Sequence, residues 1–208
     1  MQTTNPLVGK ACWKAAFGSK KLTVKICSNT TLLDNSCALF PLQLMTLLRS
    51  RLSQTRSLLQ DPQLNSTKIV LLVRDPRATL NWRSTMNSIH WNHQPVDRDN
   101  SAKLCDDLNS DLDEYVKLLR LFPDRIVMIK YESLIAAPQA TFESLFNFVG
   151  LPFTAAIERK VGDAVTQDPV MYGTFTGQVL NVTQIHRIEH NCATLLRRLD
   201  YPLSKPMV

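Results

Sequence analysis

A short basic turn follows the most apolar run of this sequence, and its residue types suit the binding of an anion. Residues 69–73 are Ile, Val, Leu, Leu and Val, and the next four are Arg74, Asp75, Pro76 and Arg77. An arginine guanidinium offers a planar fork of N–H groups that matches a phosphate or a carboxylate. The turn therefore predicts recognition of an anionic group beside Arg74. A local Arg74–Asp75 ion pair in an exposed turn is the simpler alternative.

The elements that must position this turn are predicted from the same residues. Consecutive Val, Ile and Leu residues favour a strand covered on both faces, as in a parallel sheet. Pro76 fixes its own φ and disfavours a helical Asp75, so the strand should end in a tight turn. A helix is predicted from Arg77 to Ser84, with Pro76 close to its first position. Arg74 would then lie at the carboxyl end of a buried strand, where open α/β sheets bind ligands.

A second buried strand is predicted at residues 125–129, followed by Lys130, Tyr131 and Glu132. A helix is predicted between the two strands, over residues 101–122, because its apolar residues recur at steps of three and four. The order strand, helix, helix, strand favours a crossover to a parallel neighbour. Both turns are therefore expected at the same edge of the sheet.

The remaining segments give weaker signals. Apolar spacing with flanking Pro and Gly predicts helices over residues 40–60, 138–149 and 183–199. The arginines of the first of these helices (Arg49, Arg51 and Arg56) are expected to be solvated. Residues 153–180 are expected to be irregular.

Size and composition indicate one globular domain spanning residues 1–208. The chain has 44% hydrophobic and 20% charged residues, which is typical of a globular protein. A net charge of +6 favours anionic partners, but the positive charge is scattered and predicts no nucleic-acid partner. No apolar run reaches the roughly 18 residues of a membrane span, and residues 1–9 lack a signal-peptide pattern.

The cysteines and the N-glycosylation sequons give information on the cellular compartment of the protein. The five cysteines (Cys12, Cys27, Cys37, Cys105 and Cys192) form no C-x-x-C pair, which leaves both disulfides and buried free thiols open. Sequons at Asn29, Asn65 and Asn181 favour the lumen of the secretory pathway. His90 and His93 have no partner set with suitable spacing, so no metal site is predicted.

Several segments in the same order resemble the Golgi carbohydrate sulfotransferases. The segments are residues 71–78, 104–108, 131–134 and 148–153, and Cys192 with residues 199–201 resembles the closing helix of that family. The family-like region is taken as residues 39–201, preceded by an atypical N-terminal segment, residues 1–38.

The resemblance implies an α/β fold with a three-layer parallel sheet, of the P-loop nucleotide-kinase-like sulfotransferase type. It implies transfer of a sulfuryl group from 3′-phosphoadenosine 5′-phosphosulfate (PAPS) to a sugar hydroxyl of a glycan, in the Golgi lumen and without a metal. In the family, the turn that matches Arg74 holds the donor's 3′-phosphate. The flanking candidates for donor binding are Arg77, Asn81, Trp82, Arg83 and Ser84. The catalytic residues stay unassigned.

The sequence departs from the family in two places. Trp82 stands eight residues after Arg74, where the family has a serine that also binds the 3′-phosphate. Ser84 is a poor substitute, because two residues along a helix rotate a side chain by about 200°. Residues 1–67 show neither a phosphate-cradling loop nor a membrane anchor; residues 17–21 are the nearest match to such a loop.

These departures predict a truncated scaffold, incomplete at its N-terminus and with weakened donor binding. The alternative function is a non-catalytic, basic glycan- or nucleotide-binding protein on the same scaffold. The sequence leaves the oligomeric state open.

Overall fold

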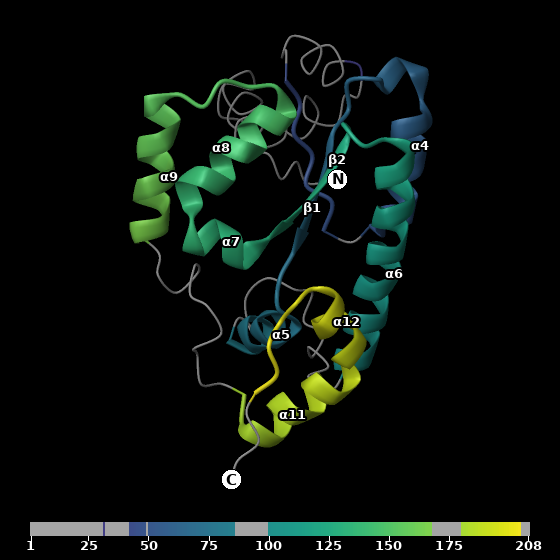
Figure 1. The fold of residues 1–208 in the computed structure, drawn as a ribbon, viewed down its shortest axis with the longest axis vertical. Coiled ribbons are helices and arrows are strands. Elements are labelled where there is room, and N and C mark those ends of the chain that lie inside the picture. The colour runs from purple at the N-terminus through teal and green to yellow at the C-terminus, as the bar shows by residue number, and fades with distance from the viewer. Residues whose placement is uncertain (1–30, 32–41, 49, 86–99, 168–179, 205–208) are drawn as a thin grey trace, which may run out of the picture. The chain divides into compact units, whose positions relative to one another are not determined.

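A computed structural model describes residues 31, 42–48, 50–85, 100–167 and 180–204 (Figure 1). The chain divides into two compact units, residues 1–49 and residues 50–208. The elements described below all belong to the second unit. None of its described helices is both long and apolar enough to cross a membrane.

A pair of parallel strands lies at the centre of this unit. Strand β1 (Ile69–Val73) pairs with β2 (Ile126–Lys130) in a register that sets Ile69 opposite Ile126 and Val73 opposite Lys130. The predicted parallel pairing is confirmed. Since both strands end at the same level, the turns that follow them share one edge of the sheet, as expected.

The predicted cover on both faces of the first strand is wrong for the described part of the chain. Val73 is buried, whereas Val70 is 39% exposed and Leu72 is 53% exposed. Alternate side chains of a strand point to opposite faces, and the described residues cover the face of Val70 and Leu72 only in part. A continuous apolar run thus identified the strand but overstated its burial.

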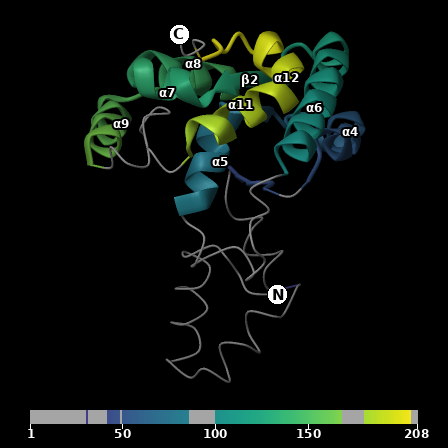
Figure 2. The ribbon, with the colours of Figure 1, turned by 90° about the horizontal axis from the view of Figure 1, so that it is seen from below.

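Helices flank the strand pair and close its carboxyl end. They are η1 (Leu52–Thr55), α4 (Arg56–Gln60), η2 (Pro62–Leu64), α5 (Pro76–Thr85), α6 (Ser101–Leu121), α7 (Tyr131–Ala136), α8 (Pro138–Val149), α9 (Ala155–Gln167), α11 (Val182–Asn191) and α12 (Ala193–Arg198). Helices α4 and α6 lie on one side of the strands and α7 to α9 on the other (Figures 1 and 2). Helices α5, α11 and α12 gather where β1 ends.

Local signals predicted some helix boundaries well. Helix α5 starts at Pro76, and α8 runs from Pro138 to Val149 as predicted. Gly150 ends α8 with a φ of 76°, in the left-handed region that glycine adopts without a steric penalty. The predicted helix over residues 101–122 is confirmed as α6.

Three of the other predictions are wrong. Residues 42–48 are not helical, so the helix expected over residues 40–60 is reduced to η1 and α4. Helix α9 lies in the segment 153–180 that was expected to be irregular, of which residues 168–179 fall outside the described part. The last helix is divided at Cys192 into α11 and α12, because that residue takes a φ of −104° and a ψ of 10°.

The core is held together by apolar packing and by one disulfide. The larger cluster joins β1, α5, α6, α11 and α12, and a second cluster joins η1, α4, α6 and β2. Cys105 on α6 is bonded to Cys192 between α11 and α12, with both residues fully buried. Two of the five cysteines therefore form a disulfide, whereas Cys12, Cys27 and Cys37 lie outside the described residues.

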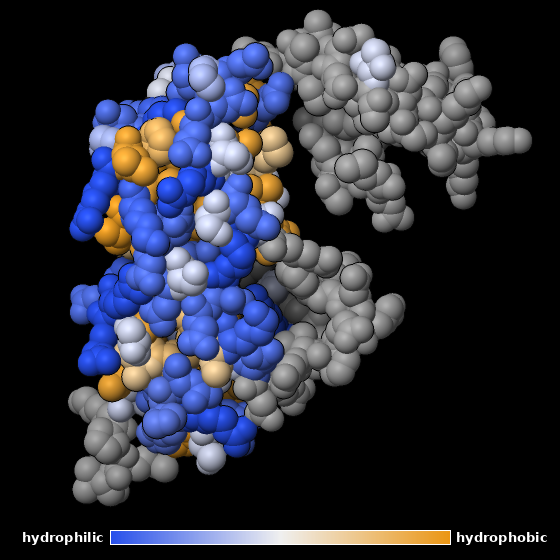
Figure 3. Space-filling model, turned by 90° about the vertical axis from the view of Figure 1, so that its right-hand side faces the viewer, coloured by the Kyte–Doolittle hydropathy of each residue, from blue (hydrophilic) through white to orange (hydrophobic). Residues whose placement is uncertain are grey.

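Arginines before α4 and at its start bind α6, which corrects the expectation that they are solvated. The Arg51 guanidinium lies 3.1 Å from Asp107 and 3.2 Å from Asp111, and Arg56 lies 2.5 Å from Glu114. Arg49 lies outside the described residues. The face that carries these helices is mostly hydrophilic, with apolar side chains between the charged ones (Figure 3).

Candidate anion-binding site

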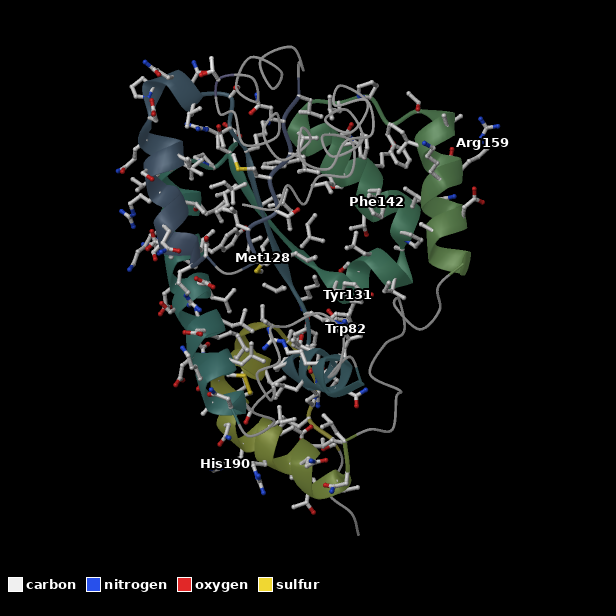
Figure 4. The ribbon with its side chains drawn as sticks, turned by 180° about the vertical axis from the view of Figure 1, so that it is seen from behind. Trp82, Met128, Tyr131, Phe142, Arg159 and His190 are labelled. Atoms are coloured by element: carbon white, nitrogen blue, oxygen red, sulfur yellow. A yellow bond between two sulfur atoms is a disulfide. The ribbon has the colours of Figure 1, made fainter. Side chains whose placement is uncertain are left out.

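The candidate site lies at the shared carboxyl end of β1 and β2. Because Val73 and Lys130 are paired in the sheet, Arg74 and Tyr131 are the first residues beyond it on neighbouring strands. The carbon at the centre of the Arg74 guanidinium is 4.2 Å from the centroid of the Tyr131 ring. This is a cation–π contact, in which the negative face of the ring attracts the cation. Figure 4 shows Tyr131 at the start of α7, directly after β2.

The carboxylate of Glu132 holds the two turns together. Its Oε1 accepts a hydrogen bond from the backbone N–H of Asp75 at 3.0 Å, and its Oε2 accepts one from the Tyr201 hydroxyl at 2.6 Å. Burial, followed by this hydrogen bond to Glu132, raises the pKa of Tyr201 above its ordinary value, so the hydroxyl keeps its proton and remains the donor. The residue before Tyr131, Lys130, donates to the carbonyl of Leu199. The segment after α12 is thereby bound to the end of β2, and Glu132 links it to the turn after β1.

A buried ion-pair network lies beside this junction. Arg77 donates to Asp75 at 2.7 Å and to Glu189 of α11 at 2.5 Å, and the three side chains are at most 9% exposed. Asp75 also accepts the backbone N–H of Arg77 at 2.8 Å. Glu189 accepts two more hydrogen bonds, from the N–H of Ser204 at 2.8 Å and from its hydroxyl at 2.6 Å.

The network shifts the pKa values of its charged members. Burial alone would lower the pKa of Arg77, but the hydrogen bonds and charges of Asp75 and Glu189 raise it above its ordinary value. Burial alone would raise the pKa of Glu189, but the bonds from Ser204 and Arg77 lower it below 4.5. Both groups are therefore charged at neutral pH and bind α5 to α11.

The six residues predicted from the sequence to bind the donor do not all face the same site. Arg74 lies against Tyr131, while Arg77 points into the ion-pair network and Asn81 accepts the backbone N–H of Leu180 at 3.2 Å. Arg77 and Asn81, one turn apart on α5, thus serve as internal contacts toward the α11 segment.

The other three candidates lie further along α5. Trp82 and Arg83 are half-buried, and Ser84 lies in the last turn of the helix. Burial lowers the pKa of Arg83 from its ordinary value, a sign that its guanidinium has lost part of its hydration. Figure 4 shows Trp82 on α5.

Sequence reasoning missed the residues that tie this site together. Tyr131 and Glu132 were expected at the same sheet edge, but not as partners of Arg74 and Asp75. Nothing in the sequence indicated that Glu189 or Tyr201 would reach these turns. Within the described residues no group of three or more His, Cys, Asp or Glu side chains could hold a metal ion, and His90 and His93 lie outside them.

The region that contains this site matches a known protein family. Residues 63–155, from η2 to the start of α9, match the sulfotransferase family. Over this region the chain is similar to the sulfotransferase family. The resemblance inferred from the sequence is therefore confirmed, and a mixed α/β architecture with a parallel strand pair is compatible with it.

The curated relatives of the chain are carbohydrate sulfotransferases. Carbohydrate sulfotransferase 1 of Rattus norvegicus is 28% identical over 134 residues, covering 57% of this chain and 32% of that protein. The Homo sapiens protein of that name is 25% identical over 173 residues, covering 72% of this chain and 42% of that protein. The chain therefore spans about a third to two fifths of the length of these sulfotransferases.

Proposed function

We propose that this chain binds PAPS at the carboxyl edge of the β1–β2 pair and transfers its sulfuryl group to a sugar hydroxyl of a glycan. The observation that carries the proposal is the position of Arg74, at the end of β1 and inside the region that matches the family. The relatives' names give the acceptor class, a carbohydrate.

In this proposal Arg74 contacts the donor's 3′-phosphate. The start of α5 adds the positive end of the helix dipole, which is favourable to an anion, whereas the N–H groups of Asp75 and Arg77 are already bonded to Glu132 and Asp75. Arg83 is the second cation, because a partly desolvated guanidinium gains from an anionic partner. Trp82 limits the space for the nucleotide in place of the family's serine. Arg77 keeps the turn in place from inside the protein.

The chemistry is a transfer between two oxygens. The acceptor hydroxyl oxygen attacks sulfur in line with the phosphate oxygen that leaves, so one S–O bond forms as the other breaks. The hydroxyl proton passes to a base, and cationic groups stabilise the charge on the departing adenosine 3′,5′-bisphosphate. The described residues that suit this last role are the arginines, whereas the base stays unassigned.

We extend the proposal to the fold and the compartment. A single domain over residues 1–208, with a family-like region at residues 39–201, would complete a three-layer parallel sheet around β1 and β2. The Golgi lumen is the proposed location. The Cys105–Cys192 disulfide supports it, because structural disulfides persist in oxidising compartments.

Titration calorimetry of the full chain with adenosine 3′,5′-bisphosphate tests the donor site. Arg74→Ala should weaken binding by about 1.5–3 kcal/mol, as expected for a hydrogen bond to a charged group. Arg120→Ala removes an exposed arginine of α6 and should leave the affinity unchanged. Equal affinities of the Arg74→Ala variant and the unaltered chain would overturn the assignment of this site.

A second candidate function is binding without catalysis. Trp82, at the position of the family's phosphate-binding serine, is the observation that favours it. Incubating the chain with labelled PAPS and a panel of glycans separates the two, since an enzyme yields labelled glycan and a binding protein does not. A pure glycan binder would also give no heat with adenosine 3′,5′-bisphosphate.

A further inference from the structure

Arg74 and Tyr131 are held together by a cation–π contact, with the central carbon of the guanidinium 4.2 Å from the ring centroid. Such a contact uses the face of the ring and needs no carboxylate. Arg77, three residues further on, is oriented instead by the carboxylates of Asp75 and Glu189. The ring of Tyr131 can therefore fix the direction of Arg74 without adding a negative charge that would oppose the binding of an anion.

Tyr131 is itself held in place by its surroundings. It begins α7 directly after β2, in register with the end of β1. The next residue, Glu132, accepts the Asp75 N–H and the Tyr201 hydroxyl, so the turn of Arg74 and the turn of Tyr131 cannot separate without breaking that bond. The ring face thus meets the guanidinium at a fixed place.

We propose that Tyr131 is a positioning residue, whose ring orients the Arg74 guanidinium toward the nucleotide phosphate. The inference rests on the proposed donor site at Arg74 and adds to it a residue from the neighbouring strand. Tyr131 acts through Arg74 and makes no contact with the ligand. Without the ring, Arg74 would sample other rotamers, and binding an anion would require ordering it anew.

Calorimetry with adenosine 3′,5′-bisphosphate on the full chain tests this role by substitution of the ring. Tyr131→Leu should weaken binding on the order of fivefold, the usual effect of a half-buried cation–π contact. Tyr131→Phe keeps the ring face and should bind as the unaltered chain does. Tyr131→Met replaces Tyr131→Leu if the latter fails to fold, as judged by its thermal midpoint. Tyr115→Leu, on α6, is the matched control and should keep full affinity.

A double-mutant cycle separates positioning from a general loss of structure. In the Arg74→Ala background Tyr131→Leu should have no further effect on affinity, because the ring then has nothing to orient. An equal loss in both backgrounds, or a loss with Tyr131→Phe as large as with Tyr131→Leu, would overturn the positioning role. If Arg74→Ala itself binds normally, or the unaltered chain shows no binding, the proposed donor site fails and the inference fails with it. If Arg74→Ala weakens binding and Tyr131→Leu does not, only the inference fails.

Discussion

Removal of the Glu189 carboxylate should be the most destabilising single change in the described charge network. Glu189→Ala deletes one of the two carboxylate partners of the buried Arg77 guanidinium, 2.5 Å away, and the acceptor of two hydrogen bonds from Ser204. Removing one member of a buried ion pair costs about 3–5 kcal/mol, since the other charge stays buried. Arg77 retains Asp75, so we expect the lower end, about 3 kcal/mol.

Urea unfolding at pH 7, followed by tryptophan fluorescence without reductant, measures this loss. A decrease of about 3 kcal/mol corresponds to a fall in the thermal midpoint of roughly 6–12 °C for a chain of this size. Glu189→Gln keeps an acceptor of the same shape and should lose only about 1–2 kcal/mol. Glu143→Ala, an exposed acid on α8, is the control and should change stability by less than about 0.5 kcal/mol. The reasoning is refuted if Glu189→Ala is no less stable than Glu143→Ala.

Three further predictions concern pH, the disulfide and glycosylation. Because the folded pKa of Glu189 lies below 4.5, its contribution to stability is complete above that value and is lost as the pH falls through the lower folded pKa. The free energy of unfolding should therefore depend less on pH in Glu189→Gln than in the unaltered chain between pH 6 and about pH 3. The same pH dependence in both chains would contradict this. Replacing both Cys105 and Cys192 by Ala opens a loop with a sequence separation of 87 residues and should cost about 4 kcal/mol, measured by urea unfolding; a chain with unchanged stability would show that the bond is dispensable. Asn65 is exposed in the turn before β1 and should carry an N-linked glycan when the chain is made in a secretory pathway. Endoglycosidase treatment should then lower the mass of the chain, and Asn65→Gln should reduce that shift by one glycan; an equal shift in both chains would contradict the prediction.

Features set by neighbouring residues were predictable from the sequence. Five apolar residues gave strand β1, Pro76 gave the start of α5, and the pair Pro138 and Gly150 gave both ends of α8. Each depends on backbone chemistry within a few residues. The parallel pairing of β1 with β2 followed from the order of the elements between them, with both turns at one edge.

Predictions that required a packing partner were less successful. Leucines at helical spacing suggested a helix over residues 40–60, yet Leu44 is 91% exposed and lies in no helix. The opposite error concerned α9, where Ile157, Val161 and Ala164 have helical spacing and line an apolar pocket with Phe142 and Phe146. Spacing defines a face, but only the tertiary structure shows whether another element covers it.

The sequence by itself determined the strand, the basic turn and the resemblance to the sulfotransferases, because local backbone preferences and short motifs are contained in consecutive residues. Only the tertiary structure decided which arginine faces which partner. Arg74 and Arg77 are three residues apart, yet the first lies on the ring of Tyr131 and the second between Asp75 and Glu189. Glu189 is separated from Arg77 by 112 residues, and Tyr201 from Glu132 by 69 residues. Contacts over such separations depend on how the helices pack around the strand ends, which no local pattern encodes.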